Sequence, residues 1–177
     1  MKLLPGVRTL MLTPHVDRRG SLTEVYRDVW CSEVPGRQVN VMVSSAGVMR
    51  GAHVHQRHVD YFTIVQGRAL VGMHDARLAS PTFGQALLIE LDAQIPAVLV
   101  VPAGVVHGVY FPLHSLLLTV ESELYDPDEE VRCRWSDAAL RIPWPCSEAC
   151  TSDADANAPS YCEMMERLGP FQSSFVL

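Results

Sequence analysis

The feature that most constrains the fold is a series of short apolar segments separated by turn residues between about Gln38 and Glu121. Segments of this length, rich in valine and leucine and bounded by glycine, proline, serine or aspartate, are typical of β-strands rather than helices. The segments are Gln38–Ser44, Tyr61–Gln66, Ala69–Asp75, Gln85–Leu91, Ala97–Val101, Val105–Phe111 and Ser115–Glu121. The pattern predicts an all-β barrel or sandwich.

The first of these segments alternates most clearly, with three valines on one face and three other residues on the opposite face (Val39, Val41 and Val43 against Asn40, Met42 and Ser44). Such alternation is typical of a half-buried strand. We expect one domain over residues 1–177, with a core barrel at about 38–121, N-terminal strands within 1–37 and a C-terminal extension over 126–177. The expected N-terminal strands are Val7–Leu12 and Leu22–Tyr26, and the extension is expected to hold a short helix at Ser160–Leu168.

Composition excludes several classes of function. The chain of 177 residues has a net charge of −6, and Lys2 is its single lysine among fourteen basic residues. Nucleic acids and anionic membranes are bound through clusters of lysine and arginine, and no such cluster occurs, so we expect neither partner. No apolar run reaches the roughly 20 residues of a membrane-spanning helix. The N-terminus does not resemble a secretory signal, so a cytoplasmic protein is expected, and its five cysteines are expected to be free thiols.

Three of the seven histidines fall in the stretch GAHVHQRHVDYF, at His53, His55 and His58. Residues two apart on a strand point to the same face, so the imidazoles of His53 and His55 can converge on one point inside a barrel. Histidine can move protons near neutral pH and is also the commonest metal ligand. The pair therefore indicates either acid–base chemistry or a metal site.

The spacing around these histidines resembles the first motif of the cupin superfamily, Gly47-x5-His53-x-His55-x4-Asp60-x6-Gly67, with Asp60 where that motif has glutamate. The segment Pro102-x-Gly104-x2-His107 resembles the second motif. The resemblance implies a double-stranded β-helix, or jelly-roll barrel, with three imidazoles and a carboxylate at its centre. Such a set suits Zn, Fe, Mn or Ni. One alternative is therefore a metal-dependent enzyme acting on another small molecule, with His53, His55, Asp60 and His107 as ligands.

A closer resemblance covers nearly the whole chain and is to the dTDP-4-dehydrorhamnose 3,5-epimerase family, which acts on nucleotide-linked 4-keto-6-deoxy sugars. The matching segments are DRRGSLTE (17–24), QVN (38–40), RGAH (50–53), DARLASPTFG (75–84), PAGVVHG (102–108), PDEEVRCRW (127–135), IPWP (142–145) and SDAD (152–155). The resemblance makes His53 the catalytic base, oriented by Asp155, with Arg50 on the phosphates. It places Arg19, Glu24, Gln38, Asn40, Asp60, His107 and Glu130 at substrate-binding positions.

Three positions depart from the family pattern. One is Ala154, which stands where the family has a lysine within the SDAD segment. Asp60 stands where the family has a lysine facing the substrate carbonyl, and Thr119 stands where it has the tyrosine that returns a proton from the opposite face. A threonine hydroxyl is a far weaker acid than a phenol, so double epimerisation by the family route is not expected. With no lysine in the barrel, the electrophile must be an arginine, a protonated histidine or a metal held partly by Asp60.

Two further alternatives stay open. The segment Arg50–His55 also resembles the RGxHAH motif of dTDP-4-keto-6-deoxyglucose 3,4-ketoisomerases, in which two histidines shuttle a proton between adjacent carbons; His55 would then be catalytic and no tyrosine would be needed. The chain could instead bind a sugar nucleotide without catalysis. The leading prediction is an epimerase or isomerase of a dTDP-linked sugar without a resident cofactor. The resemblance implies a homodimer with crossing N-terminal segments. His58, His74 and His114 have no partner in these patterns and are expected to be structural or exposed.

Overall fold

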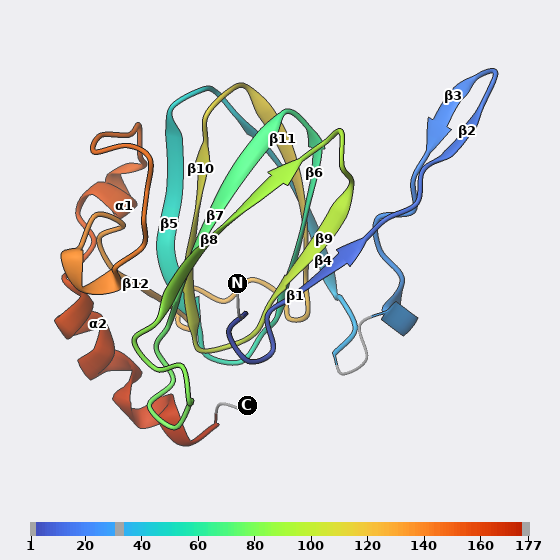
Figure 1. Cartoon of the computed structure of the whole chain (residues 1–177). Coiled ribbons are helices and arrows are strands. Elements are labelled where there is room, and N and C mark those ends of the chain that lie inside the picture. The colour runs from blue at the N-terminus through green and yellow to red at the C-terminus, as the bar shows by residue number, and fades with distance from the viewer. Residues whose placement is uncertain (1–2, 31–33, 175–177) are drawn as a thin grey trace.

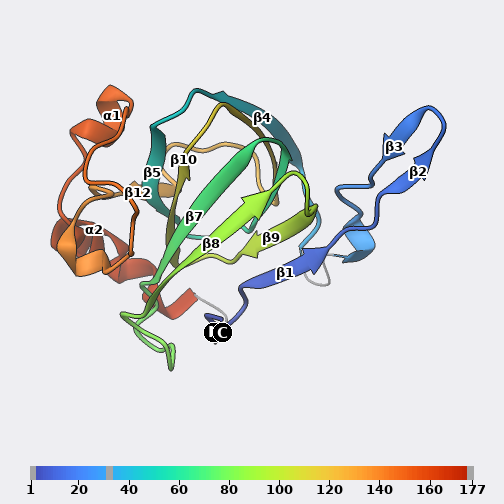
Figure 2. The same ribbon diagram turned by 45° about the horizontal axis from the view of Figure 1, so that its top comes forward.

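Two five-stranded antiparallel sheets form a barrel in the computed structural model, which describes residues 3–30 and 34–174 (Figure 1). One sheet contains, in spatial order, β1 (Arg8–Met11), β9 (Ala97–Val101), β6 (Asp60–Gln66), β11 (Ser115–Glu121) and β4 (Gln38–Ser44). The other contains β12 (Glu130–Arg132), β5 (Val48–His55), β10 (Val105–Phe111), β7 (Arg68–Asp75) and β8 (Ala86–Asp92). Figure 2 shows how the strands curve around a common interior. The predicted all-β cupin jelly roll is confirmed.

The seven strands predicted between Gln38 and Glu121 are all present, and their ends differ from the prediction by no more than one residue. β5 is an eighth strand in this region and carries His53 and His55. Gly67 joins β6 to β7 with a φ of +78°, a left-handed conformation that glycine adopts without strain. The turn residues that separated the apolar segments in the sequence are thus the residues that end the strands.

In β4 the predicted alternation is present, but the valines face outward. Val39, Val41 and Val43 are 61%, 59% and 56% exposed, whereas Asn40 is only partly exposed and Ser44 is buried. The alternation of a strand determines which residues share a face, but it does not determine which of the two faces points into the barrel. Polar residues face inward here because they hydrogen-bond to groups of the cavity described below. The outer face of β4 is therefore an exposed apolar stripe.

At the N-terminus, the strand predicted at Val7–Leu12 is confirmed as β1, which pairs with β9. The strand predicted at Leu22–Tyr26 is wrong. Only Leu22 of that segment lies in a strand, and it ends β3 (Gly20–Leu22). β3 pairs with β2 (His15–Asp17) in a separate two-stranded hairpin around the Asp17–Gly20 turn. Figure 1 shows this hairpin projecting away from the barrel. All six of its strand residues are exposed, because no other strand of the same described chain lies beside them. A short 3-10 helix, η1 (Asp28–Trp30), follows the hairpin; the label η marks 3-10 helices.

Apolar side chains fill the barrel interior away from the histidines, among them Phe62, Ile64, Val71, Phe111 and Leu117. The C-terminal extension contains η2 (Ala138–Leu140), α1 (Asp153–Ala156), α2 (Tyr161–Leu168) and η3 (Gly169–Ser174). α2 confirms the predicted helix: Ser160 caps its N-terminus in a capping box with Glu163. Met164 and Leu168 of α2 pack with Val54 and Val106 of the β5 and β10 strands. Within the described residues, no helix is long and apolar enough to cross a membrane.

Candidate active site

A cavity of about 290 Å³ lies between the two sheets. His53 and His55 of β5 and His107 of β10 line it from one sheet, and Asp60 of β6 with Thr119 and Glu121 of β11 line it from the other. His58, Arg50, Asn40 and Glu130 also contribute to its wall. The topology thus gathers residues from distant parts of the sequence, including nearly all of the predicted central site.

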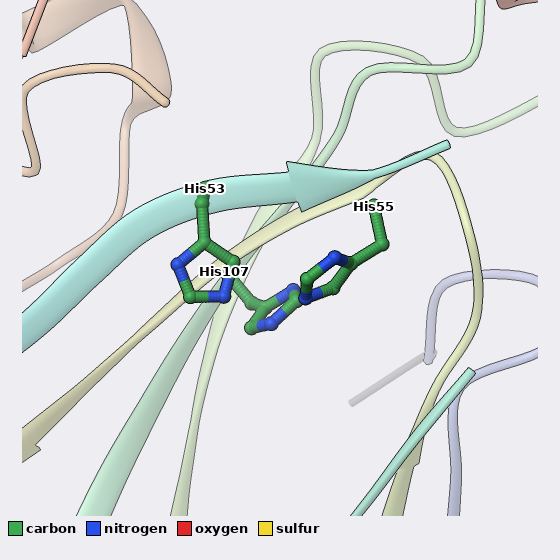
Figure 3. A group of neighbouring side chains, drawn as sticks. All are labelled: His53, His55 and His107. Carbon is green, nitrogen blue, oxygen red and sulfur yellow. The ribbon is translucent and has the colours of Figure 1, made fainter. Parts of the chain in front are cut away.

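The three imidazoles predicted to converge do so (Figure 3). The ring centroid of His53 lies 4.9 Å from that of His55 and 4.6 Å from that of His107. Gly51 makes this approach possible because it has a φ of +97°, and a side-chain Cβ there would lie 2.9 Å from the carbonyl oxygen of His107. The glycine of the RGAH segment therefore sets the spacing between the strands that carry the base and His107.

Asp60 is buried beneath these rings and faces three histidines. Its Oδ2 lies 3.4 Å from His55 Nε2 and 3.2 Å from His107 Nε2, and its Oδ1 lies 3.4 Å from His58 Nε2. Burial alone would raise the pKa of Asp60, but the neighbouring imidazoles outweigh it and hold the pKa well below its usual range. Asp60 is therefore an ionised carboxylate at neutral pH.

His58 is one of the site residues that the sequence patterns missed, since they gave it no partner. It is buried, its Nδ1 lies 2.9 Å from Glu129 Oε2, and its ring lies against that of His55 with centroids 3.5 Å apart. Burial would lower the pKa of His58, but Asp60 and Glu129 raise it to about 10. His58 lies in the loop before β6, so the usable signal was its place in the histidine-rich stretch, two residues before Asp60. His74 and His114 stay outside the site: His74 contacts Leu140 and Tyr161, and His114 is exposed.

Glu129 was missed as well, because the family pattern pointed to its neighbour Glu130. Glu129 is buried, and its Oε2 lies 3.1 Å from His55 Nδ1. Its Oε1 accepts hydrogen bonds from the backbone N–H groups of Arg57 and His58. Against the effect of burial, these contacts hold the pKa of Glu129 below its usual range. Nothing in the local sequence distinguishes Glu129, since it meets these histidines only through the fold.

His53 has no direct hydrogen bond to a carboxylate within the described chain. Its Nδ1 lies 3.9 Å from Glu130 Oε2. Asp155, predicted to orient His53, accepts instead from Arg132 Nη1 at 3.0 Å, from Ser152 Oγ at 2.9 Å and from the Gly51 N–H at 3.4 Å. The predicted His53–Asp155 hydrogen bond is therefore not formed, because Arg132 holds the carboxylate. Burial, and next the nearby His107 and His55, lower the pKa of His53 well below its usual range.

The remaining predicted residues divide between the cavity and the hairpin. Arg50 lies at the rim, where its Nε donates to Ser44 Oγ at 3.0 Å. Gln38 and Asn40 donate to Glu121, and Thr119 is buried within the wall. Arg19 and Glu24 are not brought to the cavity of the same chain: Arg19 pairs with Asp17 on the projecting hairpin, and Glu24 pairs with Arg27.

The histidines also meet the geometric requirements of a metal site. Nitrogen atoms of His53, His55 and His107 lie within 4.8 Å of one another, and Asp60 lies beside two of them. His107 Nδ1 lies 3.0 Å from the Val105 carbonyl oxygen, while its buried Nε2 has no well-aligned hydrogen-bond partner in the described chain. Imidazole nitrogens and one carboxylate form a donor set that suits a divalent transition metal. The residues therefore fit the alternative prediction of a metal site.

Comparison with known proteins identifies the family. The family profile of dTDP-4-dehydrorhamnose 3,5-epimerase matches residues 2–163. The chain is 35% identical over 171 residues to a dTDP-4-dehydrorhamnose 3,5-epimerase of Mycobacterium tuberculosis, covering 89% of this chain and 84% of that protein. It is 32% identical over 166 residues to a dTDP-4-dehydro-6-deoxyglucose 3-epimerase of a Streptomyces species, covering 88% and 84%.

Solved structures of the same family share the fold. The rmlC epimerase of Mycobacterium tuberculosis matches with a TM-score of 0.85 and 31% identity over 97% of this chain and 96% of that chain. ChmJ, a 3'-monoepimerase from Streptomyces bikiniensis in complex with dTDP-quinovose, matches with a TM-score of 0.84 and 30% identity over 94% and 88%. The barrel, the histidine-lined cavity and these similarities together show that the chain belongs to the dTDP-4-dehydrorhamnose 3,5-epimerase family.

Proposed function

We propose that this protein is an isomerase that epimerises a dTDP-linked 4-keto-6-deoxy sugar, with His53 as the base. The observation that carries the proposal is the mostly buried imidazole of His53, whose pKa is lowered, in the cavity between the sheets, with Arg50 at the rim. A lowered pKa leaves His53 unprotonated and able to accept a proton at neutral pH. A relative of similar fold was crystallised with dTDP-quinovose, a ligand of this class.

The chemistry needs a base beside the carbon and positive charge near the oxygen. His53 takes the proton from a carbon next to the ketone, and the electrons of that C–H bond form the enolate. Arg50 binds the diphosphate through its planar guanidinium. Asp60 replaces the family lysine, and the protonated His58 behind it offsets the charge of that carboxylate. The protonated His58 thus offsets part of the negative charge of Asp60 and Glu129, and Arg50 is a second cation of the cavity wall.

Solvent exchange tests the proposal directly. The protein is incubated with dTDP-4-keto-6-deoxyglucose in deuterated water, and C3 and C5 are followed by NMR. We expect deuterium to enter at C3 faster than in a protein-free control, with formation of the C3 epimer. Absence of exchange at both carbons, with ample folded protein, would contradict the proposal and favour binding without catalysis.

The same spectra separate the 3,4-ketoisomerase alternative. That alternative is favoured by one observation: the rings of His53 and His55 lie 4.9 Å apart on the same wall, and His55 is oriented by Glu129. Two bases on one side can move a proton between neighbouring carbons without an acid opposite them. A product with its ketone at C3 would establish this reaction, whereas a product that keeps the C4 ketone with inverted C3 establishes epimerisation.

The proposed assembly is a homodimer in which β4 meets a second copy. Val39, Val41 and Val43 form an exposed apolar stripe on β4, and Arg19 lies on a hairpin that projects beyond its own barrel. Exposed apolar faces of this kind mark protein–protein interfaces. We expect Val41→Glu to convert a dimer into a monomer in size-exclusion chromatography with light scattering, while Val65→Glu, on exposed β6 surface, leaves the dimer intact. A wild-type protein that is already monomeric would contradict the assembly.

The proposed reaction uses no resident metal. We expect metal analysis of untagged protein to find well below one metal ion per chain, and exchange activity to survive dialysis against a chelator. If the alternative holds, His53, His55, His107 and Asp60 would hold a divalent metal, which would polarise the carbonyl as a Lewis acid. Close to one ion per chain, together with loss of activity on chelation and recovery on adding the metal, would establish that alternative.

A further inference from the structure

Glu121 is a carboxyl group of the cavity wall that the proposed reaction has not yet used. It is the last residue of β11, two positions after Thr119. Alternate residues of a strand share a face, so both side chains point into the cavity, and both line it. Glu121 therefore lies beside the position where the family carries its acidic tyrosine.

The two sheets place Glu121 and His53 on opposite walls. β11 belongs to the sheet that also contains β6 and β4, whereas β5 belongs to the sheet with β10 and β7. Epimerisation requires this arrangement, because a proton returned by the base itself would restore the original configuration. Inversion needs a second group that delivers a proton to the opposite face of the enolate.

Neutral groups hold the carboxyl in place. Asn40 Nδ2 donates to Glu121 Oε1 at 2.7 Å, and Gln38 Nε2 donates to Oε2 at 3.1 Å. Thr119 Oγ1 lies 3.5 Å from Oε1. No ion pair of the described residues includes Glu121, so no fixed cation holds it permanently ionised. The hydroxyl of Thr119 thus helps to orient a stronger acid than itself.

The groups around Glu121 differ in their effect on its protonation. Its cross-strand partner on β6 is Asp60, with His55 and His58 from β5 and the following loop nearby, while β4 contributes only the uncharged Gln38 and Asn40. Burial, and next the charge of Asp60, raise the pKa of Glu121 and outweigh the opposing effects of His58, the hydrogen bond from Asn40 and His55. Asp60, surrounded by histidines, stays ionised.

We propose that Glu121 is the general acid that protonates the enolate on the face opposite His53, in place of the family tyrosine; this rests on the proposed epimerase function. His53 takes the proton from the carbon next to the ketone, and the C–H electrons form the enolate. Those electrons then form a new C–H bond to the carboxyl proton of Glu121, and the ketone returns. The imidazolium loses its proton to water and the carboxylate regains one from water.

The tyrosines of the described chain offer one competitor. The Tyr61 hydroxyl donates to the Val34 carbonyl at 2.6 Å, and neither Tyr61 nor Tyr110 lines the cavity. Tyr125 does line it, at the exposed rim. Tyr125→Phe therefore belongs in the test.

The test uses Glu121→Gln, which keeps the size and an acceptor oxygen for Asn40 but cannot donate a proton as an acid. Wild type, Glu121→Gln, Tyr125→Phe and the control Glu123→Gln, whose exposed side chain pairs with Arg37, are each given the dTDP-linked 4-keto sugar in deuterated water. Deuterium entry and formation of the inverted product are measured separately. We expect Glu121→Gln to retain exchange while inversion slows by about 10²- to 10⁴-fold.

Each outcome of this test bears on the role of Glu121 or on the proposed function. Inversion by Glu121→Gln at the wild-type rate, or loss of inversion in Tyr125→Phe alone, overturns the role of Glu121 and leaves the proposed function standing. If Glu121→Gln loses exchange as well as inversion, the role of Glu121 as general acid is also overturned, because the residue would then act in binding or folding. Melting temperatures of the variant and the wild type distinguish a loss of binding from a loss of folding. A wild-type protein with no exchange overturns the proposed function and the role of Glu121 with it.

Discussion

Replacing His53 by asparagine is expected to lower deuterium exchange and product formation together, by about 10²- to 10⁴-fold, the usual contribution of a positioned general base. The two rates should fall equally because His53 acts before the enolate exists, whereas Glu121 acts after it. Asparagine keeps a polar group of similar reach without a basic nitrogen. The measurement is NMR in deuterated water at saturating sugar nucleotide, so that the loss reports on the chemical step.

The matched control is His114→Asn, since His114 is exposed in the turn between β10 and β11 and does not line the cavity. This variant should exchange at the wild-type rate. Binding of dTDP by His53→Asn, followed by calorimetry, should be within a few-fold of wild type, because Arg50 rather than His53 is proposed to hold the diphosphate. Exchange by His53→Asn at the wild-type rate would exclude it as the base and direct attention to His55.

The strands and the central histidines could be predicted because they depend on local information. Strand ends follow glycines, prolines and short polar turns, and the same-face placement of His53 and His55 follows from the period of two. Their approach to His107 depends on the long-range pairing of β5 with β10, which only the family resemblance supplied. The face of β4 could not be predicted, since alternation is the same whichever face is inside.

The charged network around Asp60 could not be predicted for a related reason. Glu129 reaches His55 and His58 across the fold, and Arg132 captures Asp155 although the two lie 23 residues apart. A single sequence offers no period or spacing for such contacts. The sequence shows that Asp60 replaces a lysine of the family. That His58 is held protonated beside Asp60 could be seen only from the distances between their side chains.

Asp75→Asn is expected to destabilise the protein by about 3–5 kcal/mol, the usual cost of removing one partner of a buried ion pair. Asp75 is fully buried and accepts from Arg77 Nε at 2.8 Å and Nη2 at 2.9 Å. Ser80 and Thr82 hydroxyls each donate to its Oδ2 at 2.6 Å. An asparagine leaves the guanidinium of Arg77, itself 1% exposed, without a countercharge. The measurement is the free energy of unfolding from urea titration at neutral pH.

Two comparisons make the test specific: the loss of stability in Glu90→Gln, and the loss in Asp75→Asn measured at several pH values. Glu90 pairs with Arg68 at 3.1 Å on the exposed surface of β8, where such pairs contribute about 0–1 kcal/mol. Burial would raise the pKa of Asp75, but the bonds from Arg77, Ser80 and Thr82 leave it lowered. Because the pKa of Asp75 is lower in the folded protein than in the unfolded chain, its ionised form stabilises the fold at pH values above the unfolded-state pKa. This stabilisation is lost as the pH falls through the folded-state pKa. The difference between wild type and Asp75→Asn should therefore stay constant from pH 7 to 5 and shrink only below about pH 4. A difference near that of Glu90→Gln would mean that the DARLASPTFG segment is not held by this ion pair.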